Sequence, residues 1–284
     1  MKGQGGGRRA WVWPFGADLG PRIVSAVILI PVSLFGLFLG GIWFALLVGA
    51  VFAGGHHEFQ TMTGGRPARV YDIFLTALIP VSALIQVLLG AVMGVAVISF
   101  GIGFALLAGG GRRWWDVAGL VFFGAVVFAL IAIRGEDMWG FHAGLFLGAT
   151  VWLTDTGAYF TGRILGGAKL SPDISPSKTW SGAIGGLVTG SALALLVWVL
   201  ATPSQWWIGA AFGIGLSIVG QLGDLAESGL KRRFRIKDSG EAIPGHGGLM
   251  DRLDSLSFAA LVLFAIGLWH GGWPAIAAGF LVWP

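Results

Sequence analysis

Carboxylates and basic side chains gather in one stretch of the chain, from Gln221 to Ser255. The acids there are Asp224, Glu227, Asp238, Glu241, Asp251 and Asp254, and the bases are Lys231, Arg232, Arg233, Arg235, Lys237 and Arg252. Carboxylates hold hard divalent cations, while Lys and Arg side chains hold phosphate. Apolar runs flank the stretch on both sides. This composition is what phosphoryl chemistry at the edge of a membrane requires.

The spacing of the acids is helical. Two sets lie at i, i+3 and i+4, namely Asp224, Glu227 and Ser228, and then Asp251, Asp254 and Ser255. Each set would share one face of a helix. Between them, residues 244–248 (PGHGG) cannot be regular helix, and their glycines let backbone N–H groups approach an anion. The alternative is a solvated loop whose charges only set the topology.

The order of residues from Ser228 to Asp254 is S-x-L-K-R-x4-K-D-x-G-x2-I-P-x-H-G-G-L-x-D-R-L-D. It resembles the signature of the phosphatidate cytidylyltransferases, the CDP-diacylglycerol synthases, at every fixed position. The resemblance implies a nucleotidyltransferase of phospholipid biosynthesis that transfers CMP from CTP to phosphatidic acid and releases pyrophosphate. It also implies a homodimer.

The composition predicts an all-α, polytopic integral membrane protein. Of the 284 residues, 55% are hydrophobic and only 11% are charged, against roughly 25% charged in soluble domains. The absence of cysteine excludes disulfides and thiolate chemistry. Nucleic-acid binding is rejected despite a pI near 9.9, because the basic residues are dispersed among short loops.

Taking about 20 residues per span, we expect about nine transmembrane helices. They cover residues 23–39, 41–60, 71–89, 91–108, 116–133, 138–162, 182–201, 206–227 and 254–282. Gly40-Gly41 and Gly90 split the first two pairs into tight helical hairpins, and the last stretch can break near Gly271-Gly272.

Basic residues collect in alternate loops, and only Arg134 of the 18 falls on the opposite side. By the positive-inside rule the N-terminus is cytoplasmic, and the active site faces the cytoplasm from the cell (inner) membrane. We divide the chain into a basic cytoplasmic tail (1–22), a transmembrane scaffold (23–135) and a transmembrane catalytic region with cytoplasm-facing loops (136–284).

A second polar group lies in the sixth expected span, where Asp155 interrupts an apolar helix. Ionisable groups in such helices are costly and are candidates for function. At about 1.5 Å per residue, Asp155 and Asp224 reach the cytoplasmic edge of two parallel spans, and Asp251 enters the next span from that edge. The sequence therefore predicts that acids from three helices converge at one depth.

A Gly/Ser/Pro loop with Lys169 and Lys178 follows, and it could cradle phosphates or simply be a basic cytoplasmic loop. It resembles a second conserved region of the cytidylyltransferases. Ser177 departs from the lysine that is common there, and Ser181 departs from a common glutamate.

These observations and the resemblance together assign roles. The expected metal ligands for Mg²⁺, with a second cation left open, are Asp224, Asp251 and Asp254, and Asp155 is the alternative to Asp254 as the further partner. The candidate catalytic residues are Asp224, Asp251, Lys231, Arg232 and His246. The candidate substrate-binding residues are Asp155, Lys169, Ser175, Lys178, Thr179, Ser228, Lys237, Asp238, Gly247, Gly248 and Arg252.

For His246 two roles stay open, a hydrogen-bond donor to phosphate or a residue that only fixes its loop. Arg252 is either a phosphate ligand or the partner of a nearby acid. Within the scaffold, His56-His57-Glu58 is either an interfacial cluster or contains a substrate-facing carboxylate.

Two other functions use the same residues. An ion-coupled transporter would place carboxylates near the middle of the bilayer and show symmetry between its halves, and the sequence shows neither. A lipid or polyprenol kinase would use the same metal and lysines, but the attack would fall on the γ-phosphorus. Product analysis separates the kinase from the cytidylyltransferase.

Overall fold

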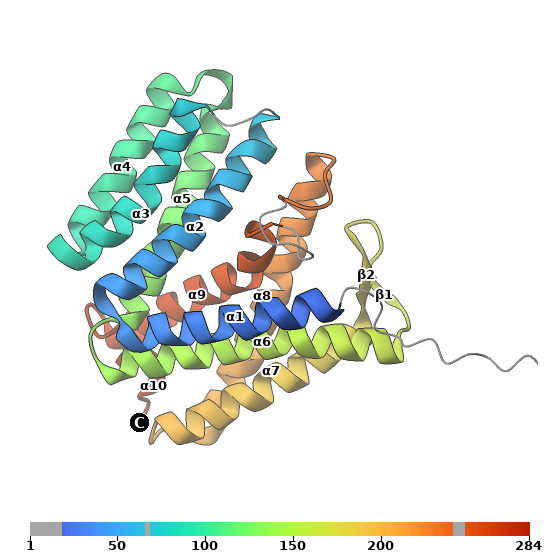
Figure 1. Ribbon diagram of the computed structural model, residues 1–284. Helices are drawn as coiled ribbons and strands as arrows, with labels where there is room; N and C mark the ends of the chain where they lie inside the picture. The colour runs from blue at the N-terminus through green and yellow to red at the C-terminus, as the bar shows by residue number, and fades with distance from the viewer. Residues whose placement is uncertain (1–18, 66–68, 241–247) are drawn as a thin grey trace, which may run out of the picture.

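The computed structural model describes residues 19–65, 69–240 and 248–284, and Figure 1 shows their arrangement. The elements in chain order are α1 (Leu19–Leu39), α2 (Gly41–Gly64), α3 (Val70–Leu89), α4 (Ala91–Ala108), the 3₁₀ turn η1 (Gly110–Arg112), α5 (Arg113–Arg134), α6 (Met138–Leu165), β1 (Lys169–Ser171), β2 (Ser175–Thr179), α7 (Trp180–Ala201), α8 (Trp206–Arg233), α9 (Met250–Gly271) and α10 (Ile276–Leu281). The prediction of a helical membrane protein is confirmed.

Among the described residues, seven helical segments are long and apolar enough to cross a membrane. They are α2, α3, α4, the segment Gly110–Arg134 that contains α5, α7, α8 and α9. The nine expected ranges correspond to nine long helices, but α6 does not meet this criterion, and the described apolar part of α1, Val27–Leu39, is shorter than a full span. Nine crossings therefore stay a prediction.

Glycine forms the sharp turns of both predicted helical hairpins. Gly40, between α1 and α2, has φ 63°, and Gly90, between α3 and α4, has φ 94°. A side chain at these φ values would be strained, so glycine ends one helix and begins the next without a longer loop. The expected break in the last stretch is also present, because α9 ends at Gly271 and α10 begins five residues later.

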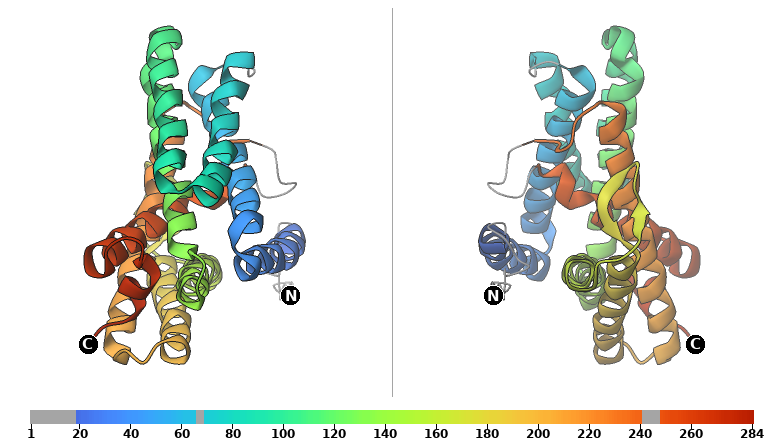
Figure 2. Two further views of the ribbon diagram at one scale, coloured as in Figure 1. Left: turned by 90° about the vertical axis from the view of Figure 1, so that its left-hand side faces the viewer. Right: turned by 90° about the vertical axis from the view of Figure 1, so that its right-hand side faces the viewer.

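Helix α9 connects the two halves of the molecule. Helices α2 to α5 form one bundle, and α6 to α8 pack in sequence on the other side (Figures 1 and 2). Helix α9 packs against α8 and α6 and also against α2 and α5. Its position therefore depends on elements from both halves of the sequence.

A row of glycines on α7 allows close packing against α6. Gly182, Gly186 and Gly190 recur every four residues and are buried. A Cβ atom added to Gly186 would lie 2.5 Å from the carbonyl oxygen of Thr154, so a side chain there would push the two helices apart. Small residues at this spacing are typical of closely packed transmembrane helices.

The expected irregular loop after α6 contains a short antiparallel hairpin, which is the exception to an all-α fold. Strands β1 and β2 pair Lys169 with Thr179 and Ser171 with Ser175. Thr179 also begins α7 as its N-cap, because its hydroxyl accepts a hydrogen bond from the backbone N–H of Gly182 at 3.1 Å. The hairpin thereby holds Lys178 at the entrance to α7.

Candidate active site

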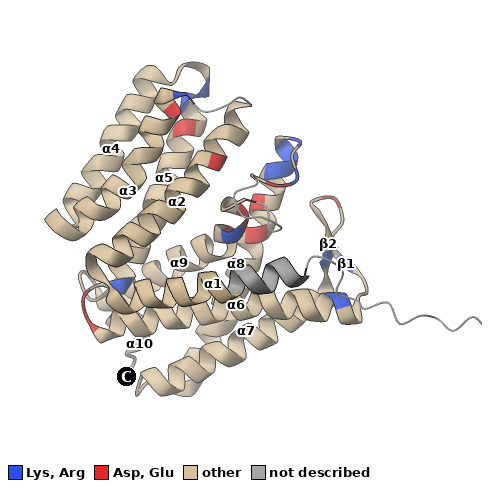
Figure 3. Cartoon of the chain, viewed as in Figure 1, with Lys and Arg blue, Asp and Glu red and all other residues tan. Residues whose placement is uncertain are grey.

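Three carboxylates converge where α8 and α9 meet. Asp224 and Glu227 come from α8 and Asp254 from α9, and one oxygen from each lies within 4.8 Å of the other two. The i, i+3 spacing places the two α8 acids on one helix face. Figure 3 shows acidic and basic residues concentrated at the C-terminal end of α8 and the N-terminal end of α9. A second group lies toward the ends of α2, α3 and α5.

This arrangement fits a divalent cation. Both carboxylate oxygens of Glu227 are buried, and Oε2 lies 3.5 Å from Nζ of Lys231. Mg²⁺ holds oxygen ligands at about 2.0–2.1 Å, which puts pairs of ligand atoms up to about 4.2 Å apart. The three acids need only small movements to reach that geometry, and a cation would offset the repulsion between them.

Lys178 reaches this acidic cluster from the β-hairpin. Its ammonium Nζ lies 2.6 Å from Oδ2 of Asp224, and both side chains are partly exposed. Arg232 ties the hairpin to α8, because its Nε donates to the carbonyl oxygen of Ile174 at 3.2 Å. The structure therefore places the Lys178 loop against the acids.

Asp251 lies beside this cluster with both oxygens engaged. Its Oδ1 accepts a hydrogen bond from Nζ of Lys231. Its Oδ2 accepts from the backbone N–H groups of Ser239 at 3.1 Å and Gly248 at 2.9 Å. Asp251 as a metal ligand stays a prediction that requires Lys231 to release it, and the geometry favours Glu227 as the third ligand.

Lys231 joins the two helices. Besides Asp251, it lies 3.5 Å from Oε2 of Glu227, one turn earlier on α8. The sequence showed Glu227 at the right spacing after Asp224, but we gave it no role. What distinguishes it from Asp251 is burial and the packing of α8 against α9, and neither is readable from spacing.

The remaining predicted residues surround this centre to different degrees. Asp155 lies on α6 beside the cluster, and the hydroxyl of Ser255 donates to its Oδ1 at 3.5 Å. The exposed ones are Lys169, Arg232, Lys237, Asp238 and Arg252, and the buried ones are Ser175, Thr179, Ser228 and Gly248. His246 and Gly247 lie outside the described residues. At the position of the missing glutamate, the Ser181 hydroxyl donates to the carbonyl oxygen of Gly166.

An apolar cavity of about 310 Å³ opens beside the acids. Its walls come from α2, α5, α8 and α9 and include Phe59, Trp115, Ala118, Phe122, Phe123, Ala226, Leu230, Met250, Leu253, Ser257 and Phe258. Glu227 and Asp254 also line it. A hydrocarbon chain and a charged group of one molecule can therefore be held side by side here.

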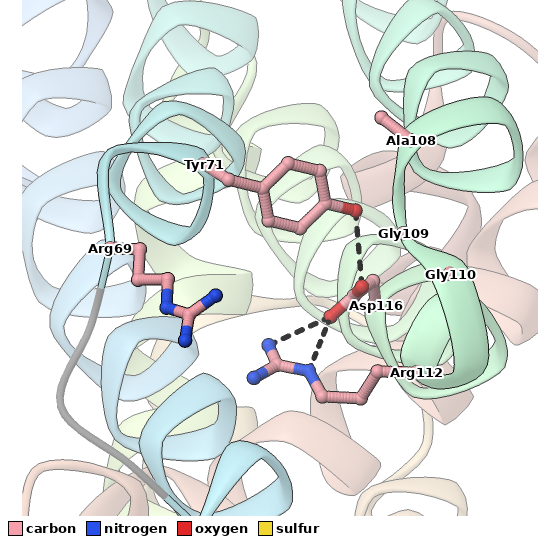
Figure 4. A pocket seen from close by; sticks show the side chains of 7 residues that line it. All are labelled: Arg69, Tyr71, Ala108, Gly109, Gly110, Arg112 and Asp116. Carbon is pink, nitrogen blue, oxygen red and sulfur yellow. Dashed lines mark hydrogen bonds and ion pairs between the residues drawn. The ribbon is translucent and has the colours of Figure 1, made fainter.

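A second pocket, of about 260 Å³, lies at the ends of α3, α4 and α5 (Figure 4). Arg112 and Asp116, which line it, are paired with each other. Arg112 contacts Asp116 at 2.8 Å and Asp72 at 2.9 Å, and the hydroxyl of Tyr71 donates to Asp116 at 3.0 Å. This group ties the helices of the N-terminal bundle together.

Comparisons with known proteins agree with the resemblance seen in the sequence. The model of the cytidylyltransferase family matches residues 20–269. A phosphatidate cytidylyltransferase of Brucella suis is 39% identical over 254 residues, which are 88% of this chain and 94% of that protein. One from Pseudomonas aeruginosa is 36% identical over 285 residues, covering 89% of this chain and 98% of that protein. One from Staphylococcus saprophyticus is 48% identical over 123 residues, covering 43% of this chain and 47% of that protein.

Proposed function

The chain belongs to the cytidylyltransferase family, and from that premise we propose that it is a phosphatidate cytidylyltransferase of the membrane. It would transfer CMP from CTP to phosphatidic acid and so make CDP-diacylglycerol and pyrophosphate for phospholipid biosynthesis. The lipid or polyprenol kinase and the transporter are not favoured by these relatives.

One observation carries the proposal: the acidic cluster and the apolar cavity share Glu227 and Asp254. A lipid phosphate must reach a nucleotide while its acyl chains stay out of water. The cavity walls can hold an acyl chain, and the phosphate then lies beside the carboxylates. We propose that the cluster holds Mg²⁺, with a second cation left open.

The reaction is a substitution at the α-phosphorus of CTP. An oxygen of the lipid phosphate forms the new bond, the bond to the oxygen that bridges to the β-phosphorus breaks, and pyrophosphate leaves with that electron pair. The attacking oxygen is already anionic, so the reaction needs no strong general base. Mg²⁺ bound at the carboxylates would neutralise charge between the two polyanions.

The basic residues around the cluster would bind the nucleotide. Lys178 is held by Asp224 and can exchange that carboxylate for a phosphate of CTP. Lys169 is exposed on β1, Arg232 is exposed where it contacts the hairpin at Ile174, and both can bind phosphates further out. Lys231 is buried between Glu227 and Asp251, so its first effect is to hold α8 and α9 at a fixed spacing.

We further propose a multi-pass protein of the cell (inner) membrane with nine crossings and a cytoplasmic N-terminus and active site. All basic residues except Arg134 then lie on the side where CTP is available. We also propose a homodimer that binds no nucleic acid.

The test is product analysis with purified protein. Each of the four nucleoside triphosphates is incubated with Mg²⁺ and phosphatidic acid. We expect CDP-diacylglycerol and pyrophosphate from CTP alone, and Asp224→Asn should abolish this product while inserting normally. A nucleoside diphosphate as the co-product would indicate a kinase and refute the proposal.

A further inference from the structure

Glu58, from the N-terminal bundle, reaches the start of α9. Its Oε1 accepts a hydrogen bond from the backbone N–H of Leu249, and its Oε2 accepts from that of Met250, both at 2.9 Å. The hydroxyl of Ser239 donates to Oε2 as well, at 2.7 Å. Glu58 is 8% exposed and lies about 190 residues from these partners in the sequence.

Helix α9 has no cap of its own. Leu249 stands at its N-cap position, and no side chain there accepts a hydrogen bond from the first turn. The first N–H groups of a helix need acceptors, and a negative charge at that end is favourable. Glu58 supplies both from another helix.

The surrounding glycines match this role. A Cβ atom on Gly240 would lie 2.6 Å from Oε1 of Glu58, and one on Gly248 would overlap Oε2 and the hydroxyl of Ser239. Because neither glycine has a Cβ atom, the Glu58 carboxylate can approach the backbone of this segment closely. Glu58 accepts three hydrogen bonds from the protein, so it is not poised to bind a cation.

The position of α9 decides where Asp254 lies, because Asp254 is one helical turn beyond Met250. From the other side, Lys231 of α8 holds Asp251. We propose that Glu58 is a positioning residue, which seats the first turn of α9 on α2 so that Asp254 meets Asp224 and Glu227 in one cation site. The inference depends on the proposed function only for the identity of the reaction that the cation site serves.

Binding of Mn²⁺ alone, measured by electron paramagnetic resonance on the full-length protein in detergent, tests the inference without the reaction. Glu58→Gln keeps the shape of the side chain but replaces one carboxylate oxygen by an NH₂ group. That group then faces one of the three hydrogen-bond donors and cannot accept from it. Residues that orient metal ligands typically contribute 10–100-fold to affinity. We therefore expect Mn²⁺ affinity to fall about tenfold or more, and the Mg²⁺ needed for half-maximal activity to rise equally. The control is His57→Gln, because His57 is the exposed residue directly before Glu58. This variant should bind Mn²⁺ as the wild type does.

A cross-link tests the position of α9 directly. A Cβ atom on Gly54 of α2 would lie 4.0 Å from Cβ of Leu249, within the usual range of about 3.5–4.5 Å for a disulfide. The chain has no other cysteine to compete. Gly54→Cys with Leu249→Cys should oxidise readily in the wild-type background and more slowly with Glu58→Gln. Once formed, the disulfide should restore Mn²⁺ affinity to the Glu58→Gln protein.

Unchanged Mn²⁺ affinity and unchanged cross-linking in Glu58→Gln would overturn the inference. So would weakened Mn²⁺ binding that the disulfide does not restore. If Glu58→Gln does not fold, Ser239→Ala removes one of the three donors, and its Mn²⁺ affinity must fall in the same direction for the inference to stand. A wild-type protein that binds Mn²⁺ and cross-links as expected, but makes no CDP-diacylglycerol from CTP, would refute the proposed function and leave this inference intact.

Discussion

Glu227→Gln should have opposite effects on stability with and without a divalent cation. Two carboxylates at most 4.8 Å apart repel by at least about 3.5 kcal/mol at an effective dielectric constant of about 20. Glu227 faces two such neighbours, Asp224 and Asp254, which gives about 7 kcal/mol of repulsion. The attraction between Glu227 and Lys231, 3.5 Å apart, offsets about 5 kcal/mol of this repulsion. Without a cation, the charge on Glu227 therefore costs about 2 kcal/mol.

The assay is thermal unfolding in detergent, in EDTA and then over a series of Mg²⁺ concentrations. In EDTA we expect Glu227→Gln to be more stable than the wild type by about 2 kcal/mol. With Mg²⁺ the wild type should gain stability, and the variant should gain much less and lose activity. Glu136→Gln removes an exposed charge elsewhere and should change neither response. A Glu227→Gln protein that is less stable in EDTA, yet responds to Mg²⁺ as the wild type does, would refute the assignment of this carboxylate to a cation site.

Three further changes test other parts of the site and the fold. Lys178→Met removes the cation beside Asp224 and should raise the KM for CTP about tenfold in a steady-state assay, with little change in the KM for phosphatidic acid. Ala118→Trp fills part of the apolar cavity and should do the reverse, raising the KM for phosphatidic acid while leaving that for CTP unchanged. Arg134→Gln loses the bonds from the guanidinium to the carbonyl oxygens of Leu37 and Phe38, so thermal unfolding should show a loss of about 2–4 kcal/mol with activity per folded molecule retained.

The sequence predicted those features that depend on local pattern. Apolar runs predicted the positions of the long helices, and Gly40 and Gly90 predicted the hairpin turns, because a positive φ excludes most other residues there. The i, i+3 spacing placed Asp224 and Glu227 on one face of α8. Each of these inferences needs only a few neighbouring residues and the period of a helix.

The features that the sequence could not predict depend on contacts between distant segments. Asp251 and Asp254 are alike in type and spacing, and only the packing of α9 against α8 turns Asp254 to the cluster and Asp251 to Lys231. The hairpin was expected as an irregular loop, because serines and prolines of this kind carry no alternating apolar pattern. Its pairing follows from the way α6 and α7 bring its ends together.

The N-terminal half takes part in the site in two physical ways. Phe59 and Trp115 form walls of the apolar cavity, and Glu58 holds the first turn of α9. Both contributions act on the boundary between the cation cluster and the lipid, where a shift of about 1 Å in one helix can separate a phosphate from its ligands. The site therefore takes residues from both sides of the division of the chain at residue 135. Because α9 contacts α2 and α5 as well as α8, the two bundles cannot move apart without displacing Asp254 from Asp224 and Glu227.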